Sequence, residues 1–309
     1  MKRKHHFIPA TYLAGFTDKW ERVGRFWAVP KNNTSAYGTN ANDACAIRDY
    51  NRLDVGEDPN LIEDWYGDTV ESDIGESLNN IRGSGNLPEN KELTPLLILL
   101  AILFSRNPTF RSNTAMAYES MCRAYLSMLE SSQDLYESTQ KEALEEGYID
   151  HLLPFEEFLE LTEKEKVSVI ANKDYLIISE VEGLKDAAEM LSKRRWRLYS
   201  IEADSDFELI TSDRPFILSH PDATPKMPLG LETSKSTVMV PINKRSLLIG
   251  SFEDGDNGSY IASRELIGNA NTKIVQSCDK LFYSSKESIS FSDSNKNWNW
   301  NIFQNPSNE

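Results

Sequence analysis

The segment that most constrains the fold is Leu96–Phe104, in which all nine residues are apolar. Thr94 and Pro95 before it form a cap-plus-proline helix start, and Pro108 disfavours helical geometry at Asn107. A helix that is apolar on every side has to be surrounded by other elements. The segment is also about half of the ~20 residues that cross a bilayer. We therefore predict a buried central helix and no contact with a membrane.

The remaining patterns predict helices first and strands afterwards. Apolar residues at helical spacing predict helices over 58–81, on both sides of the break at Asn107, and over 175–193. Residues 31–54 have no clear period and are expected to be mostly loop. From Arg195 onward short alternating segments predict strands, with 207–211 as the hairpin partner of 195–202.

These elements predict an α+β fold, in which a helical amino-terminal two-thirds packs on a mainly antiparallel β-sheet in the carboxy-terminal third. Residues 1–194 and 195–284 are expected to form one integrated domain. Residues 285–309 form a polar tail, in which Trp298, Trp300 and Phe303 are the side chains able to hold the tail against the body.

The charge distribution limits the partners of the protein. The net charge is −15, and non-specific nucleic-acid binding depends on Lys and Arg that neutralise phosphates. We therefore expect nucleic acid to bind only through a local basic site or a bound divalent metal. The stretch 130–165 is heavily acidic and is the expected surface for a protein partner.

The three cysteines, Cys45, Cys122 and Cys278, are far apart and odd in number. This pattern favours free thiols in a reducing compartment over a disulfide framework or a zinc site. The basic start of the chain has no apolar core of a secretory signal behind it. We therefore expect a cytoplasmic protein.

The beginning of the chain carries two adjacent histidines, His5 and His6, in a basic setting. Pro9 fits the first turn of a short helix, and three apolar residues then share one face of it, which are Tyr12, Leu13 and Phe16. Such a segment can dock and bring the histidines with it. Adjacent side chains diverge in a strand or helix, so we expect at most one histidine to act chemically and the other to hold the turn.

Two acidic and two basic residues accompany the histidines as candidates. Glu63 and Glu71 lie on the helix predicted over 58–81, where Glu63 either completes a capping box with Asn60 or needs a cationic partner on the apolar face. Arg106 and Arg111 flank the helix break and could hold a phosphate or carboxylate. The alternative is that they pair with carboxylates and fix the layers.

Ser212-Asp213-Arg214-Pro215 forms a turn motif after a strand. Asp213 is a turn residue on the simplest interpretation, and a metal ligand or acid–base group on the other. No glycine-rich phosphate loop, zinc-protease motif or nucleophile elbow occurs in the sequence.

Four motifs occur in a fixed order, and together they carry a resemblance. They are His5-His6-x-x-Pro9-x-x-Tyr12-Leu13-x-x-Phe16, Glu63 with Val70-Glu71, Arg106-Asn107-Pro108-x-Phe110-Arg111, and Thr211-Ser212-Asp213-Arg214-Pro215. Over residues 4–284 the chain resembles the bacterial family of domain of unknown function 4238. That family usually has Asn in the turn where this chain has Arg214. The resemblance implies no activity.

Two functional hypotheses follow from these residues. The first is a phosphodiester-cleaving hydrolase, a nuclease-like effector in bacterial phage defence or of toxin type. His5 or His6, Glu71 and Asp213 would supply acid–base or ligand groups, and Arg106 and Arg111 would bind the phosphate. The second is a non-catalytic module, in which the same polar residues recognise a ligand or another protein.

Overall fold

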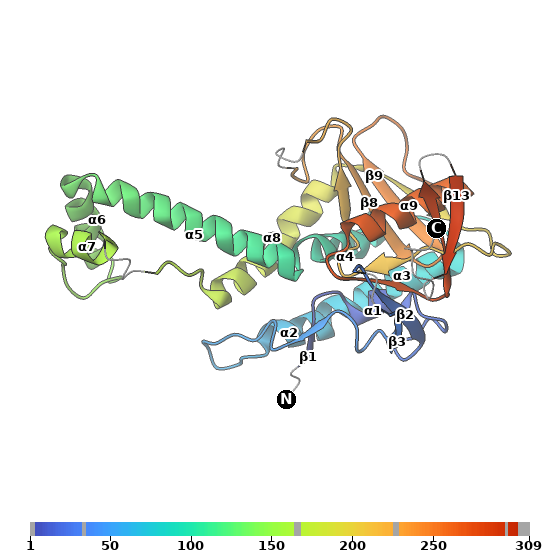
Figure 1. Cartoon of the computed structure of the whole chain (residues 1–309), viewed down its shortest axis with the longest axis horizontal. Helices are drawn as coiled ribbons and strands as arrows, with labels where there is room; N and C mark the ends of the chain where they lie inside the picture. Colours follow the sequence, from blue (N-terminus) through green and yellow to red (C-terminus); the bar gives the residue numbers. More distant parts are fainter. Residues whose placement is uncertain (1–3, 33–34, 164–167, 225–228, 294–295, 302–309) are drawn as a thin grey trace. The chain divides into compact units, whose positions relative to one another are not determined.

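The structure, a computed structural model, describes residues 4–32, 35–163, 168–224, 229–293 and 296–301. The side chains of Asn90, Ser290 and residues 292–301 lie outside this description. The chain divides into two compact units (Figure 1). Unit 1 comprises Met1–Phe110 and Ile177–Glu309, and unit 2 comprises Arg111–Leu176.

The predicted buried helix is α4 (Thr94–Ser105), which begins with Pro95 in its first turn. Seven of its side chains from Leu96 to Leu103 are buried in the main core of unit 1. The next helix, α5 (Pro108–Glu130), begins at the proline that ends the first. Among the described residues no single helix has both the length and the apolar character needed to cross a bilayer, and α4 and α5 reach them only when taken together.

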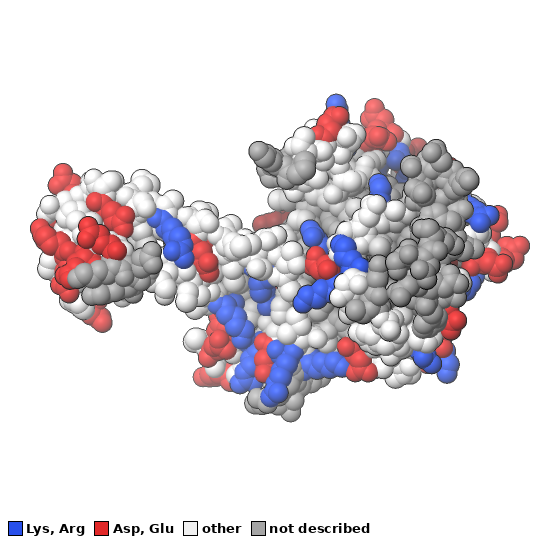
Figure 2. All heavy atoms as spheres, viewed as in Figure 1, with Lys and Arg blue, Asp and Glu red and all other residues white. Residues whose placement is uncertain are grey.

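Unit 2 is helical and has a small core of its own. It contains most of α5, with α6 (Gln133–Glu145) and α7 (Phe155–Glu163). Tyr136 and Phe158 stack with their ring centroids 4.5 Å apart, and Leu129 is buried with them. This unit has 14 acidic residues against 6 basic ones, and Figure 2 shows acidic side chains gathered over α6 and α7. The predicted acidic surface therefore belongs to unit 2.

The first sheet of unit 1 has five strands in the order β10-β5-β9-β8-β7. Their bounds are β5 (Arg195–Ser200), β7 (Ile217–Ser219), β8 (Thr237–Asn243), β9 (Ser246–Ser251) and β10 (Gly258–Ile261). All neighbours are antiparallel except β10 and β5. The predicted pairing of 195–202 with 207–211 is wrong, because β5 pairs with β9. Trp196 lies opposite Gly250, where a Cβ atom would come within 2.5 Å of the indole ring.

The second sheet has the order β3-β2-β11-β6. Its strands are β2 (Arg25–Pro30), β3 (Tyr37–Asn40), β6 (Thr211–Ser212) and β11 (Leu281–Ser284). Because β2 and β3 come from the first forty residues, the sheets are not confined to the last third of the chain. The α+β class holds. The described residues of 31–54 are mostly turn and loop, as predicted, apart from the short strands β3 and β4 (Ala46–Arg48).

The amino-terminal segment forms β1 (Lys4–His6), which pairs with β4, and then α1 (Ala10–Ala14). The helix predicted over 58–81 runs from α2 (Leu61–Trp65) through a π-helical turn (Tyr66–Val70) into α3 (Glu71–Ser84). A short 3₁₀ turn (Asn90–Leu93) leads into α4.

The return from unit 2 is α8 (Lys173–Ser192). Near the carboxyl end, β12 (Ser288–Asp293) and β13 (Lys296–Asn301) form a hairpin beside α9 (Arg264–Ser277) (Figure 1). Ile289 and Phe291 of β12 are buried in a core with residues of α9. The side chains expected to hold the tail, those of Trp298, Trp300 and Phe303, lie outside those described.

Candidate functional site

The paired strands β1 and β4 give the two histidines different surroundings. His5 is fully buried, and its Nδ1 accepts a hydrogen bond from the backbone N–H of Asn51 at 3.0 Å. His6 is partly exposed, and its Nε2 lies 3.2 Å from the carbonyl oxygen of Asn42. Because a carbonyl can only accept, Nε2 carries the proton, and Nδ1 of the neutral ring keeps its lone pair. His5 is therefore held within the fold, and His6 is the more exposed of the two histidines.

The segment after the histidines is docked as its apolar pattern predicts. Tyr12, Leu13 and Phe16 are fully buried. The Tyr12 hydroxyl donates to the carbonyl oxygen of Pro241 at 2.8 Å and lies 2.8 Å from the Thr211 hydroxyl oxygen. These contacts join α1 to β8 and β6, so the position of β1 is fixed by the two main sheets.

Arg106 is the centre of a buried polar group. Its side chain is 1% exposed, and its Nη2 donates to Glu63 Oε2 at 3.0 Å. Asn51 donates its Nδ2 to the same oxygen at 2.7 Å, and the guanidinium carbon lies 3.7 Å from the centroid of the Tyr66 ring. Arg106 Nε and Nη1 are buried without a hydrogen-bond partner among the described residues. Two nitrogen atoms of a buried cation thus have no acceptor among the described residues.

The capping box predicted for Glu63 is wrong. Asn60 makes no side-chain capping bond at the start of α2, because the Glu63 carboxylate is instead bound by Asn51 and Arg106. The second interpretation, a carboxylate that needs a cationic partner, is the correct one.

Glu71 lies at the junction of the π-helical turn and α3. Its Oε2 accepts from Thr11 Oγ1 at 3.0 Å and from Arg22 Nη2 at 2.8 Å, and Arg22 also donates to Thr11. In a regular α-helix Glu63 and Glu71 would diverge by roughly 80°. One π-helical turn accommodates an extra residue and brings the offset to about 20°. The π turn therefore places both carboxylates on one side.

The charges of Glu63, Glu71 and Arg106 affect the pKa of His6. Burial lowers the pKa of His6, the charges of Glu71 and Glu63 and the Asn42 acceptor act to raise it, and Arg106 lowers it further. The His6 ring is consequently neutral at pH 7. We call His6, Glu63, Glu71, Arg22 and Arg106 the amino-terminal cluster.

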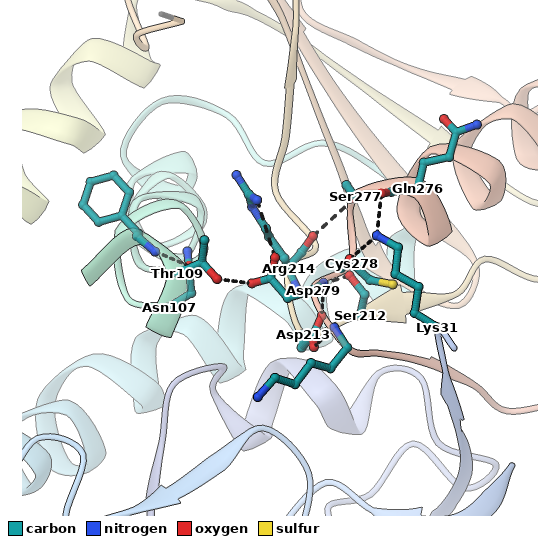
Figure 3. A network of polar contacts seen from close by, with 12 residues as sticks. Lys31, Asn107, Thr109, Ser212, Asp213, Arg214, Gln276, Ser277, Cys278 and Asp279 are labelled. Carbon is teal, nitrogen blue, oxygen red and sulfur yellow. Dashed lines mark hydrogen bonds and ion pairs between the residues drawn. The ribbon is translucent and has the colours of Figure 1, made fainter. Parts of the chain in front are cut away.

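Asp213 belongs to a different network, shown in Figure 3. Its carboxylate accepts from the backbone N–H groups of three successive residues, Asp279, Lys280 and Leu281, at 2.9, 2.7 and 3.0 Å. The side chain is 7% exposed. Burial raises the pKa of Asp213, while the three N–H donors act in the opposite direction. Among the described contacts none joins Asp213 to a histidine, and the geometry is that of a residue holding the turn between α9 and β11.

The helix break between α4 and α5 connects the two networks. Arg106, at the end of α4, points to the amino-terminal cluster, whereas Thr109 donates to Asp279 Oδ2 at 2.5 Å (Figure 3). Asn107 Oδ1 accepts from the Phe110 N–H at 2.8 Å and so satisfies the start of α5. Arg111 is the first residue of unit 2, and its position relative to the cluster is not determined.

The structure thus brings together His6, Glu63, Glu71 and Arg106 of the residues considered from the sequence. Arg22, Thr11 and Asn51 were not predicted. Arg22 stands in an irregular segment without periodicity, and Asn51 in a stretch expected to be loop, so local sequence patterns carry no signal for either. Only the long-range folding of β1, α1 and α3 places them.

The potential metal ligands are dispersed. Within the parts of the chain that the structure describes, no three His, Cys, Asp or Glu side chains are grouped so that they could hold a metal ion. Cys45, Cys122 and Cys278 are free thiols, as predicted.

Comparison with known proteins places the chain in a family. It matches the family model described as "Protein of unknown function (DUF4238)" over residues 4–288. No match was found among curated proteins or among solved structures. The matched segment includes β1, the helix break, the Asp213 turn and β11, and on this match the chain belongs to the DUF4238 family.

Proposed function

We propose that the protein is a phosphodiester-cleaving hydrolase of polynucleotides, and that the amino-terminal cluster handles the cleaved phosphate. The observation that carries the proposal is Arg106, a buried guanidinium with two unpaired donors beside a neutral histidine. A buried donor without a partner costs about 1–3 kcal/mol. Phosphate oxygens are strong acceptors for such a group and can bind a guanidinium in a bidentate manner.

In this proposal His6 is the general base. Its neutral Nδ1 removes a proton from a water molecule, the water oxygen forms a bond to phosphorus, and the bond to the leaving oxygen breaks. The leaving oxygen takes its proton from solvent. General-base catalysis of this kind contributes about 10²–10⁴-fold to the rate.

The arginines stabilise negative charge. Arg106 Nε and Nη1 would bind the oxygens of the phosphate as charge develops on them, which is typically the largest contribution in such sites. Glu63 and Glu71 hold Arg106 and Arg22 in place. Asp213 has no part in this scheme, because its carboxylate is occupied by backbone donors.

The surface beside the cluster supports a polynucleotide substrate on this acidic chain. Figure 2 shows basic side chains gathered around β1. Lys4 of β1 and Arg48 of β4 lie opposite each other in the strand register and are exposed. Lys4 pairs with Asp43 and Arg48 with Asp49, so a phosphate backbone that crosses this strand pair would bind by displacing these carboxylates from the two cations.

A second function has one observation in its favour. Arg106 is 1% exposed, and the pairs Glu63–Arg106 and Glu71–Arg22 are mutual. Mutual pairs in a closed cluster are what a non-catalytic ligand- or protein-binding module would have. The two candidates differ in whether Arg106 and His6 change a rate.

Cleavage assays on single-stranded RNA and DNA, each with Mg²⁺, Mn²⁺ or EDTA, test the proposal. We expect His6→Ala to lower the rate at least 10²-fold, and Arg106→Met to have an effect of similar size. His151→Ala, which removes an exposed histidine of unit 2, is the matched control and should retain the wild-type rate. Absence of cleavage in all conditions, or equal rates in wild type and His6→Ala, would leave the binding module as the function.

A further inference from the structure

A cavity of about 190 Å³ lies next to the amino-terminal cluster in unit 1. Its wall is formed by the end of α1, by residues 20–22, by one face of α3 and by the end of β8. Sites for drug-sized ligands measure about 300–1,000 Å³. This cavity is therefore suited to one small group and not to a whole cofactor.

Asn243 gives the cavity an unsatisfied buried donor. The residue is 3% exposed, and its Oδ1 accepts from the backbone N–H of Arg245 at 2.8 Å. Its Nδ2 is buried and has no hydrogen-bond partner among the described residues. Since Asn243 lines the cavity, an acceptor placed there would satisfy this N–H₂ group.

Trp20 is strained in the cavity wall. Its φ is +62°, a left-handed conformation that is a genuine outlier for a bulky residue. Such strain costs on the order of 1–3 kcal/mol and concentrates at ligand-binding sites. The indole ring is also in contact with two cations: Arg82 Cζ lies 4.6 Å and Lys244 Nζ 4.7 Å from its centroid.

Two of the three charged side chains that line the wall are cationic. Arg22 and Arg82 line the cavity, and Glu21 is the acidic residue among the lining side chains. Arg22 also contacts Glu71, through its Nη2. One arginine therefore belongs both to the cavity and to the cluster, and a group bound in the cavity would be adjacent to a group bound by the cluster.

We propose that this cavity is a subsite for a second phosphate group of the substrate, bound by Arg82, Arg22 and the Asn243 amide next to the phosphate that is cleaved. The inference rests on the proposed function for the identity of the substrate, but not for the binding itself. The chemistry required of the ligand is a compact oxyanion that accepts several hydrogen bonds. A phosphate at the end of an oligonucleotide and free phosphate both have this chemistry.

Calorimetric titration of the full chain with inorganic phosphate at constant ionic strength tests the subsite. Wild type should bind phosphate saturably, and Arg82→Gln should weaken binding at least tenfold, whereas Arg82→Lys should restore part of it. Arg214→Gln removes an exposed arginine outside the cavity and is the matched control. Equal affinity in wild type and Arg82→Gln, or no saturable binding to wild type, would overturn the inference.

A second measurement avoids dependence on the folding of a variant. Phosphate added to the wild-type protein should shift the indole N–H resonance of Trp20, assigned with Trp20→Phe, and an unchanged resonance at saturating phosphate would overturn the inference. Dinucleotides with and without a 5′-phosphate distinguish a terminal phosphate from free anion: the phosphorylated form should bind at least tenfold more tightly. Equal affinity of the two dinucleotides would contradict a substrate subsite.

The two proposals fail in distinguishable ways. Phosphate binding that depends on Arg82, without any cleavage, would contradict the hydrolase and support the subsite. Cleavage that is lost in His6→Ala but has an unchanged KM in Arg82→Gln would support the hydrolase and contradict the subsite.

Discussion

Two buried polar networks meet at the break between α4 and α5, and they differ in how fully the charged group at the centre of each is hydrogen-bonded. In the network of Asp213, three backbone N–H groups bind one carboxylate. In the amino-terminal cluster, Arg106 has one hydrogen bond to Glu63 and two nitrogen atoms without a partner in the described parts of the chain. The hydrogen bonds of the backbone compensate the burial of the Asp213 carboxylate. The burial of the Arg106 guanidinium is compensated only in part, and this lowers the stability of the fold.

Arg194 lies between these two cases. It is 2% exposed, and its Nη1 and Nη2 donate to the carbonyl oxygens of Ser236 and Leu231 at 2.7 and 2.6 Å. Of its three nitrogen atoms, Nε alone lacks a partner among the residues that the structure describes. Burial lowers the pKa of Arg194 to about 10. Burial alone therefore does not distinguish the two arginines. Arg106 has two nitrogen atoms without a partner among the described residues, and Arg194 has one.

The largest expected effect is the loss of the Asp213 carboxylate. Asp213→Ala leaves three backbone donors of residues 279–281 without their acceptor, and hydrogen bonds to charged groups are each worth about 1.5–3 kcal/mol. We expect the free energy of unfolding to fall by about 3–5 kcal/mol, measured by urea denaturation. The cleavage rate per folded molecule should be unchanged, because the residue acts on the turn.

Arg214→Ala is the control for this variant. Arg214 pairs with Asp279 at 3.5 Å and is 46% exposed, so its loss should cost less than about 1 kcal/mol. A stable Asp213→Ala protein without cleavage activity would reverse the comparison and return Asp213 to the site.

The second effect concerns the Glu63–Arg106 pair. Arg106→Met leaves Glu63 buried without its cation, which should lower the free energy of unfolding by about 2–3 kcal/mol. Glu63→Gln combined with Arg106→Met removes both charges, and the double variant should recover at least half of that loss. The cleavage rate should stay at least 10²-fold below that of wild type in both variants.

This double-mutant cycle separates stability from function. If the double variant regains both stability and cleavage, Arg106 only balances Glu63, and the cluster is structural. Strictly additive losses in the cycle would show that the two side chains do not interact in solution.

Much of the fold can be predicted because its signals are local. Apolar patterns and the backbone chemistry of proline predict the buried helix α4, the break at Pro108 and the docking of α1 through Tyr12, Leu13 and Phe16. The partner of β5 could not be predicted in this way. Strand pairing depends on contacts such as Trp196 against Gly250, which are far apart in the sequence.

The residues of the candidate site also differ in whether local sequence patterns reveal them. Polar residues next to recognisable breaks, such as Arg106 and Asp213, can be singled out from the sequence, but their roles depend on what surrounds them. The sequence does not show that backbone donors occupy Asp213, or that a π-helical turn brings Glu63 and Glu71 to one side. Arg22 and Asn51 carry no local pattern, and only tertiary structure reveals them.

The smallest expected effect is the pH dependence that His6 confers on stability. Burial lowers the pKa of His6 in the folded protein, so at pH values just below the ordinary histidine pKa of about 6.5 the unfolded chain binds a proton that the folded chain does not. The stability that the neutral His6 ring contributes is therefore fully present above about pH 6.5 and is lost as the pH falls through the pKa of the folded state. The free energy of unfolding changes by at most ~1.4 kcal/mol per pH unit in this range.

His6→Gln keeps an N–H donor for the Asn42 carbonyl but does not titrate. Its free energy of unfolding should decline less steeply than that of wild type between pH 7 and pH 5, whereas His151→Gln should follow wild type. Because Asp213 is unaltered in all three proteins, the difference between their slopes isolates the amino-terminal cluster. Equal slopes in wild type and His6→Gln would mean that His6 is protonated alike in folded and unfolded chains, and a general base that is neutral because of burial would then be excluded.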